Sequence, residues 1–93
     1  LTGEAAAAIG LVQRAVAREE LTTQVEALCL RLAEGPPLAI AASKRSLQHA
    51  LDVDVKSQIE WEAHCQAALG KSTDVREGIA AFFARRAPRF SGQ

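Results

Sequence analysis

Apolar residues recur at helical spacing along most of the chain, and breaks in that spacing separate the helices it predicts. Within residues 19–33 they occupy one face of an α-helix: Leu21, Val25, Leu28 and Leu32. Gly35 and Pro36 then end the helix. Pro37 suits the first turn of a second helix, which is expected to run to about residue 50. The pattern therefore predicts two consecutive helices with a short break between them.

The second half of the chain predicts a helix over residues 54–69 with two apolar faces. Asp52 or Asp54 is expected to cap its start, and Gly70 to end it. The faces comprise Val55, Ile59, Ala63 and Gln66 on one side and Trp61, Cys65 and Ala68 partly opposite. Because one domain covers only one face of a helix, two faces predict a second partner.

The last helix is predicted to begin at Thr73 or Asp74 and to end before Pro88. Glu77 stands three residues after Asp74, a spacing that resembles a capping box. A tight apolar stripe runs along this helix: Val75, Ile79, Phe82 and Phe83. We therefore expect Phe82 to lie in the core.

The two ends of the chain carry shorter features. Residues 4–9 predict a short helix that Gly10 ends, and residues 11–16 suggest a short strand or an extended connector. The tail, residues 91–93, is expected to be frayed. The whole pattern predicts one all-α domain of about four helices with a short extended segment near residues 11–16.

Composition and charge exclude several classes of protein. Eleven basic and eleven acidic residues cancel, which argues against a general electrostatic affinity for nucleic acid or an anionic membrane. No apolar run approaches the roughly 18 to 20 residues that span a bilayer, so no membrane partner is expected. The opening Leu1-Thr2-Gly3-Glu4 resembles no signal peptide and lacks methionine, so we expect that upstream residues are missing.

Cys29 and Cys65 are too few for a disulfide scaffold. We expect both to be free thiols, buried as small hydrophobic residues in a reducing, cytoplasmic environment.

No complete catalytic or metal-binding set of side chains is present. Glu60 and Glu62 point to nearly opposite sides of a helix and cannot act as a paired acid and base, although Glu62 is a candidate for a buried or inter-subunit ion pair. The soft metal ligands are few: His49, His64, Cys29 and Cys65. Glu60 and His64, four residues apart, offer half of a metal site, so no metal is expected. From its residues alone, the chain is a helical packing or assembly module.

Arg85, Arg86 and Arg89 form a basic cluster at the end of the last helix. One interpretation is favourable charge at a helix C-terminus. The other is a site for a phosphorylated ligand, because a guanidinium donates two hydrogen bonds to a phosphate.

Three stretches of the chain resemble the C-terminal part of the enoyl-CoA hydratase/isomerase (crotonase) superfamily. They are Gly-Leu-Val-Gln-Arg-Ala-Val at residues 10–16, Gly-Pro-Pro-Leu-Ala at 35–39 leading to Lys44, and Ser-Thr-Asp-Val-Arg-Glu-Gly-Ile-Ala-Ala-Phe at 72–82, followed by Arg89-Phe90. The Asp-x-x-Glu-Gly-x-x-Ala-Phe pattern is the most specific. Leu1-Thr2-Gly3 also matches, but the family has several more residues before the Gly-Leu-Val.

The resemblance implies a fold in two parts. The family's N-terminal ββα domain, which provides the oxyanion-binding N–H groups and the acidic residues, has no counterpart in residues 1–93. These residues correspond to the C-terminal helical region, which mediates trimers or hexamers and covers the acyl-CoA pocket. Arg85 matches the basic position near the coenzyme A phosphate, and Gln66 stands where an aromatic residue often lines the acyl pocket.

Two hypotheses follow from the sequence. The first is the C-terminal part of an enzyme that adds water to α,β-unsaturated acyl-CoA thioesters, with acyl-CoA as substrate and no tightly bound cofactor. Isomerase, dehydratase and hydrolase remain open as the parent activity. The second is a non-catalytic helical module for self-association or interaction.

Overall fold

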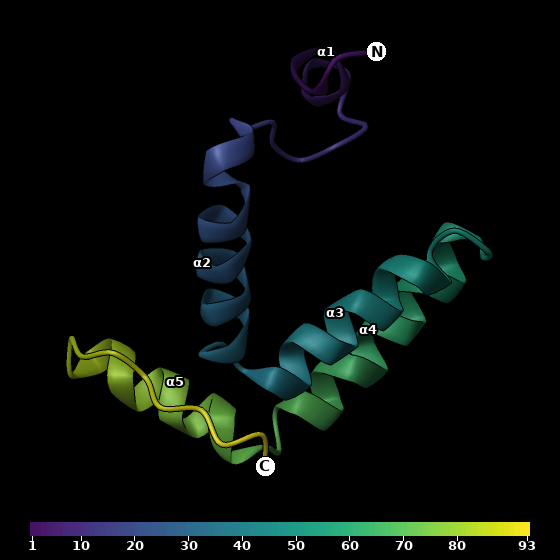
Figure 1. The fold of residues 1–93 in the computed structure, drawn as a ribbon. Coiled ribbons are helices and arrows are strands. Elements are labelled where there is room, and N and C mark those ends of the chain that lie inside the picture. Colours follow the sequence, from purple (N-terminus) through teal and green to yellow (C-terminus); the bar gives the residue numbers. More distant parts are fainter. The chain divides into compact units, whose positions relative to one another are not determined.

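The computed structural model describes residues 1–93 and is entirely helical, with no strand (Figure 1). Five α-helices and one 3₁₀ turn follow one another: α1 (Gly3–Ala8), η1 (Arg18–Glu20), α2 (Leu21–Ala33), α3 (Pro37–His49), α4 (Val55–Leu69) and α5 (Thr73–Phe83). The all-α prediction is therefore confirmed. The chain divides into two compact units, Leu1–Leu30 and Arg31–Gln93.

In the first unit, local hydrogen bonds set both ends of α1. The Thr2 Oγ1 atom accepts a hydrogen bond from the amide of Ala5 at 3.2 Å. Gly10 has a φ of 74°, and its amide donates to Ala7 O while that of Leu11 donates to Ala6 O. This is the glycine-ended helix terminus that the sequence predicted. No strand forms over residues 11–16, which connect α1 to η1 without regular secondary structure.

The α2 helix forms where it was predicted, but its apolar face is open to solvent. None of its residues is buried. The four side chains of the predicted face, Leu21, Val25, Leu28 and Leu32, are all exposed. Cys29 is exposed as well, so the expectation that it is buried was wrong.

In the second unit, α3 and α4 lie side by side in opposite directions (Figure 1). Pro37 occupies the first turn of α3, as predicted. Of the two candidate caps for α4, Asp54 is the cap: its carboxylate accepts hydrogen bonds from the amides of Lys56 and Ser57 and from the Ser57 hydroxyl. The hydrogen bonds from Ser57 lower the pKa of Asp54. Gly70 ends the helix, again as predicted.

The start of α5 differs from the prediction. Ser72, rather than Thr73 or Asp74, is the N-cap, and its hydroxyl accepts the amide of Val75 at 3.2 Å. Asp74 is the second residue of the helix, in its first turn, and is buried. Its carboxylate binds the chain's tail, which leaves the capping role to Ser72. The tail is therefore bound to α5, and the prediction that it is frayed was wrong.

No large hydrophobic side chain is fully buried. The buried apolar residues are alanines: Ala6, Ala42 and Ala81. Phe82 and Phe83 are 78% and 80% exposed, so the expectation that Phe82 lies in the core was wrong. Helical periodicity identified the apolar faces, but this chain does not cover them.

Candidate functional site

Gln66, the predicted acyl-pocket residue, lines two adjoining grooves in the second unit. The first runs between α3 and α4, beside Ser43, Ser46, Glu62 and Cys65. It contains hydroxyl, thiol and carboxylate groups, so it is suited to polar partners. The Gln66 carboxamide makes no hydrogen bond within the chain and is free to bind a group placed there.

The second groove is more apolar and has a volume of about 320 Å³. It lies where the start of α3, the end of α4 and the start of α5 meet. Its apolar lining includes Leu38, Leu69, Val75 and Phe90. Its polar lining residues are Ser43, Gln66, Ser72 and Asp74. A groove with a mostly apolar lining and a few polar groups is typical of a site for a small molecule.

Arg85, the predicted phosphate ligand, is the only non-glycine residue with a positive φ, 51°. It is the first residue beyond the C-cap of α5, and its amide donates to Phe82 O at 3.2 Å while that of Arg86 donates to Ala81 O. Glycine usually occupies this position, because a left-handed conformation costs other residues roughly 1 to 2 kcal/mol. The Arg85 guanidinium makes no hydrogen bond or ion pair, so it is available to an anion.

The three arginines of the basic cluster do not share one role. Arg86 forms a two-pronged ion pair with Glu77, with Nη1–Oε1 and Nη2–Oε2 distances of 2.6 and 2.8 Å. This pair raises the pKa of Arg86 and, together with the Arg89 amide, lowers the pKa of Glu77 to about 2. Glu77 therefore binds the segment after the helix, and its predicted capping-box contact does not form. Only the side chains of Arg85 and Arg89 remain without a partner.

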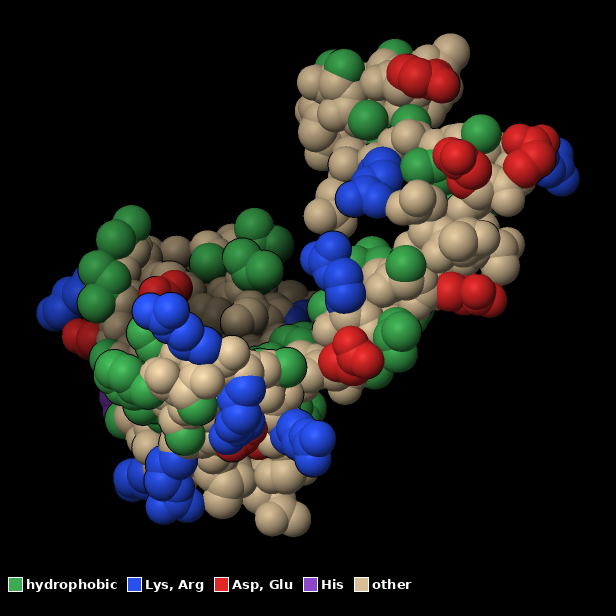
Figure 2. Space-filling view, turned by 90° about the vertical axis from the view of Figure 1, so that its left-hand side faces the viewer, with side chains coloured by type: hydrophobic (Ala, Val, Ile, Leu, Met, Phe, Trp, Pro, Cys, Tyr) green, Lys and Arg blue, Asp and Glu red, His purple; other side chains and the backbone are tan.

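Arg85 and Gln66 are not brought to one groove. Neither groove beside Gln66 is lined by Arg85. Arg86, Ala87 and Arg89 line a separate, open hollow. Figure 2 shows basic side chains close to exposed hydrophobic ones on the surface of the protein. The two predicted site residues are thus separate features, one in the groove region and one at the end of α5.

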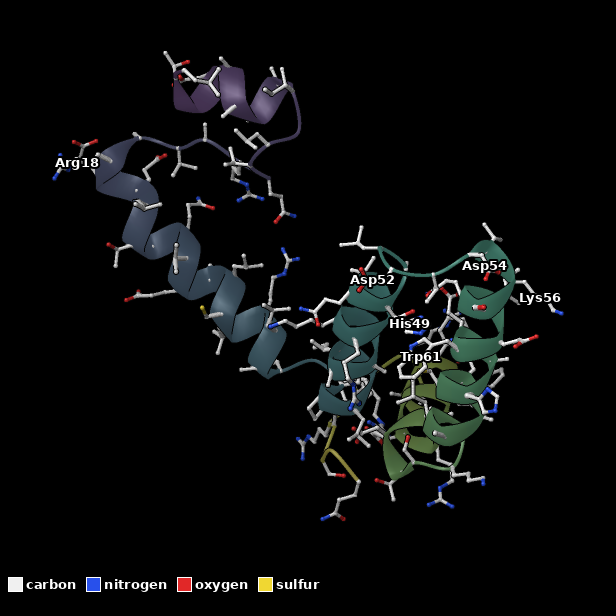
Figure 3. All side chains as sticks on the ribbon, turned by 90° about the vertical axis from the view of Figure 1, so that its right-hand side faces the viewer. Arg18, His49, Asp52, Asp54, Lys56 and Trp61 are labelled. Atoms are coloured by element: carbon white, nitrogen blue, oxygen red, sulfur yellow. The ribbon has the colours of Figure 1, made fainter.

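A polar network between α3 and α4 was not predicted from the sequence. His49 stacks on Trp61, with ring centroids 4.6 Å apart, and its Nδ1 donates to the Gln58 amide oxygen at 2.9 Å (Figure 3). The Gln58 amide nitrogen donates to Ser46 Oγ and to Glu62 Oε1, both at 2.8 Å. Glu62 is therefore a hydrogen-bond acceptor and makes no ion pair within the chain. The network fixes the register of the two helices, and no spacing along one helix could reveal it.

The other candidate residues remain apart. His64 Nδ1 binds the backbone carbonyl of Glu60 at 2.7 Å, so these two side chains do not form half of a metal site. No three side chains of the His, Cys, Asp and Glu types gather at one place. Cys29 and Cys65 are free thiols. None of the helices has the length and apolar character needed to cross a membrane.

Comparison with known proteins adds the family context. A family model described as enoyl-CoA hydratase/isomerase matches residues 1–93. The "Probable enoyl-CoA hydratase" of Rhodobacter capsulatus is 38% identical over 90 residues, covering 97% of this chain and 35% of that protein. The 1,2-epoxyphenylacetyl-CoA isomerase of Escherichia coli is 31% identical, covering 100% of this chain and 36% of that protein.

Solved structures similar to this chain also include enoyl-CoA hydratases. The crystal structure of enoyl-CoA hydratase subunit I from Geobacillus kaustophilus HTA426 aligns with a TM-score of 0.93 at 36% identity. The alignment covers 100% of this chain and 36% of that one. The chain thus spans about a third of the length of the relatives it matches.

Proposed function

The chain belongs to the enoyl-CoA hydratase/isomerase family, and on this premise we propose that it is the C-terminal helical part of an enzyme that adds water to α,β-unsaturated acyl-CoA thioesters. In this proposal, residues 1–93 assemble subunits and cover the acyl-CoA pocket. A missing N-terminal domain provides the chemistry. The observation that carries the proposal is the exposure of nearly every large apolar side chain around a core of alanines.

The exposed apolar faces support the assembly role. Large apolar side chains are exposed on each of the helices α2 to α5, and exposed apolar patches mark interaction surfaces. Phe82 and Phe83 meet edge to face, with ring centroids 5.7 Å apart, and both are open to a partner. Homo-oligomerisation through α4 and α5 would cover these side chains and provide the second partner that α4 is expected to need.

The grooves beside Gln66 support the pocket-covering role. An acyl chain placed in the more apolar groove would contact Leu38, Leu69 and Phe90, which line it. Gln66 would present an amide where an aromatic side chain is common in the family. We therefore propose that Gln66 contributes to the choice of acyl chain.

Arg85 is the proposed ligand of the coenzyme A phosphate, because its guanidinium is unpaired at a fixed turn. We expect Arg85→Ala to raise the KM for acyl-CoA about 10-fold and leave kcat nearly unchanged, since the thioester lies far from the adenosine end. The effect should shrink with a substrate that lacks the ribose phosphate. Arg76→Ala, an exposed arginine on α5, is the matched control.

Other results would contradict the assignment of the phosphate contact to Arg85. An increase in KM for Arg89→Ala but not for Arg85→Ala would move the phosphate site to Arg89. If all arginine variants of the cluster behave like the control, the cluster only complements the helix dipole.

The second candidate is a non-catalytic module for self-association. It is favoured by the same exposed faces and by the lack of a paired acid and base, because Glu62 is engaged with Gln58 and Ser46. Intact mass spectrometry of the native protein separates the two functions. A polypeptide about three times this length supports the enzyme, whereas a native chain of this length without hydratase activity supports the module.

A further inference from the structure

Two carboxylates of α5 bind the backbone of the segment that follows the helix. We call residues 86–92 the return segment, because they run back along α5 (Figure 1, yellow). The first carboxylate belongs to Asp74, which is only 5% exposed. Asp74 accepts the amides of Ser91 and Gly92 at 2.6 and 3.0 Å. The second carboxylate, Glu77, lies one turn further along and accepts the amide of Arg89 at 2.7 Å.

Further contacts complete the attachment. The Thr73 amide and hydroxyl both donate to Gln93 O at 2.6 Å. The Phe90 ring lies over Gly78, where a Cβ would be at an ordinary contact distance of 3.7 Å from the ring. Ala81, in the last turn of α5, is 1% exposed. Within the Asp-x-x-Glu-Gly-x-x-Ala-Phe pattern, Asp74 and Glu77 thus accept amides of the return segment, and Gly78 lies against Phe90.

Arg85 is the residue at the reversal between α5 and the return segment. The helix end holds the backbone of Ala84, the residue before Arg85. The bidentate ion pair between Arg86 and Glu77 holds the residue after Arg85. A non-glycine residue persists in a left-handed conformation only when its surroundings over-determine it. The carboxylates therefore supply the constraint that the conformation of Arg85 requires.

We infer that Asp74 and Glu77 are positioning residues that bind the return segment to α5 and thereby fix Arg85 for an anionic ligand. The last step rests on the proposed phosphate contact of Arg85. Fixing the residue in advance lowers the conformational entropy that anion binding would otherwise cost. Glu77 acts through Arg86, the residue after Arg85, and Asp74 anchors the far end of the return segment.

Hydrogen exchange on the protein tests the attachment one carboxylate at a time. Glu77→Gln should speed exchange of the Arg89 amide by about 10-fold or more, because an amide group is a weaker acceptor than a carboxylate. Asp74→Asn should do the same at Ser91 and Gly92 and leave Arg89 protected. A variant that leaves its own amides protected would overturn the attachment.

Matched controls exclude general effects of lost charge. Glu34→Gln and Asp52→Asn remove exposed carboxylates that make no hydrogen bond, and they should leave all three amides protected. If Asp74→Asn fails to fold, exchange of the wild-type protein still tests the role of Asp74. The Ser91 and Gly92 amides, which Asp74 accepts, should be protected at least about 10-fold more than the Phe90 amide, which makes no hydrogen bond. Equal protection of the three amides would contradict the role of Asp74.

Kinetics of the assembled enzyme test the positioning of Arg85. Glu77→Gln should raise the KM for acyl-CoA about 3- to 10-fold with kcat unchanged, and should have no further effect in an Arg85→Ala background. If Arg85→Ala alone has no effect, the proposed phosphate contact fails, and hydrogen exchange still decides the attachment. If Arg85→Ala raises KM while Glu77→Gln frees the Arg89 amide without changing KM, the positioning inference is overturned.

Discussion

Replacing Phe82 with alanine should weaken association of the chain far more than folding. The ring is 78% exposed, so its removal leaves no cavity in the chain. We therefore expect the free energy of unfolding of the monomer to fall by less than about 0.5 kcal/mol. A phenylalanine in a packed core would lose about 3 to 5 kcal/mol on the same change.

The expected loss of association follows from the area that the ring still exposes. A phenylalanine buries about 150 to 250 Å² when it is covered, and 78% of that area remains open. At about 25 cal/mol per Å², covering it is worth at most about 3 to 5 kcal/mol. Alanine retains part of the contact, so we expect a loss of about 2 to 3 kcal/mol, or a Kd about 30 to 150 times higher.

Sedimentation velocity over a concentration series measures the Kd, and urea unfolding measures folding stability. Arg76→Ala, on the same helix, should change neither quantity. A wild-type chain that stays monomeric at about 100 μM without binding a hydrophobic dye would refute the assembly argument. So would a Phe82→Ala variant that unfolds easily but associates normally, because the ring would then be packed within the chain.

Two further predictions concern the end of α5. Because the hydrogen bond from Arg86 lowers the pKa of Glu77 from 4.5 to about 2, Glu77 should stabilise the fold above about pH 4.5 and lose that effect as the pH falls towards 2. The difference in unfolding midpoint between wild type and Glu77→Gln should shrink across this window, and a constant difference would contradict the pairing. Arg85→Gly should be about 1 kcal/mol more stable to urea than Arg85→Ala, because glycine accepts a positive φ without strain; equal stabilities would argue against the left-handed turn.

The amino-acid sequence determined where the helices lie. Gly10, Pro37, Asp54 and Gly70 ended or began helices as predicted, because capping depends on groups within a few residues of each other. Periodicity also identified the apolar stripe of each helix. Short stretches in a fixed order carry the family resemblance, and the same resemblance points to Arg85.

Only the tertiary structure decided what these stripes and side chains contact. The stripe that ends at Phe82 has the same spacing whether a core or a partner covers it, and in this chain nothing does. Asp74 satisfies every local rule for a cap, yet its carboxylate binds amides 17 and 18 residues further along. Local spacing fixes the backbone conformation at helix ends because capping hydrogen bonds join residues within one turn of each other. Burial and long-range pairing depend on which segments meet after folding, and that information is spread over residues far apart in the sequence.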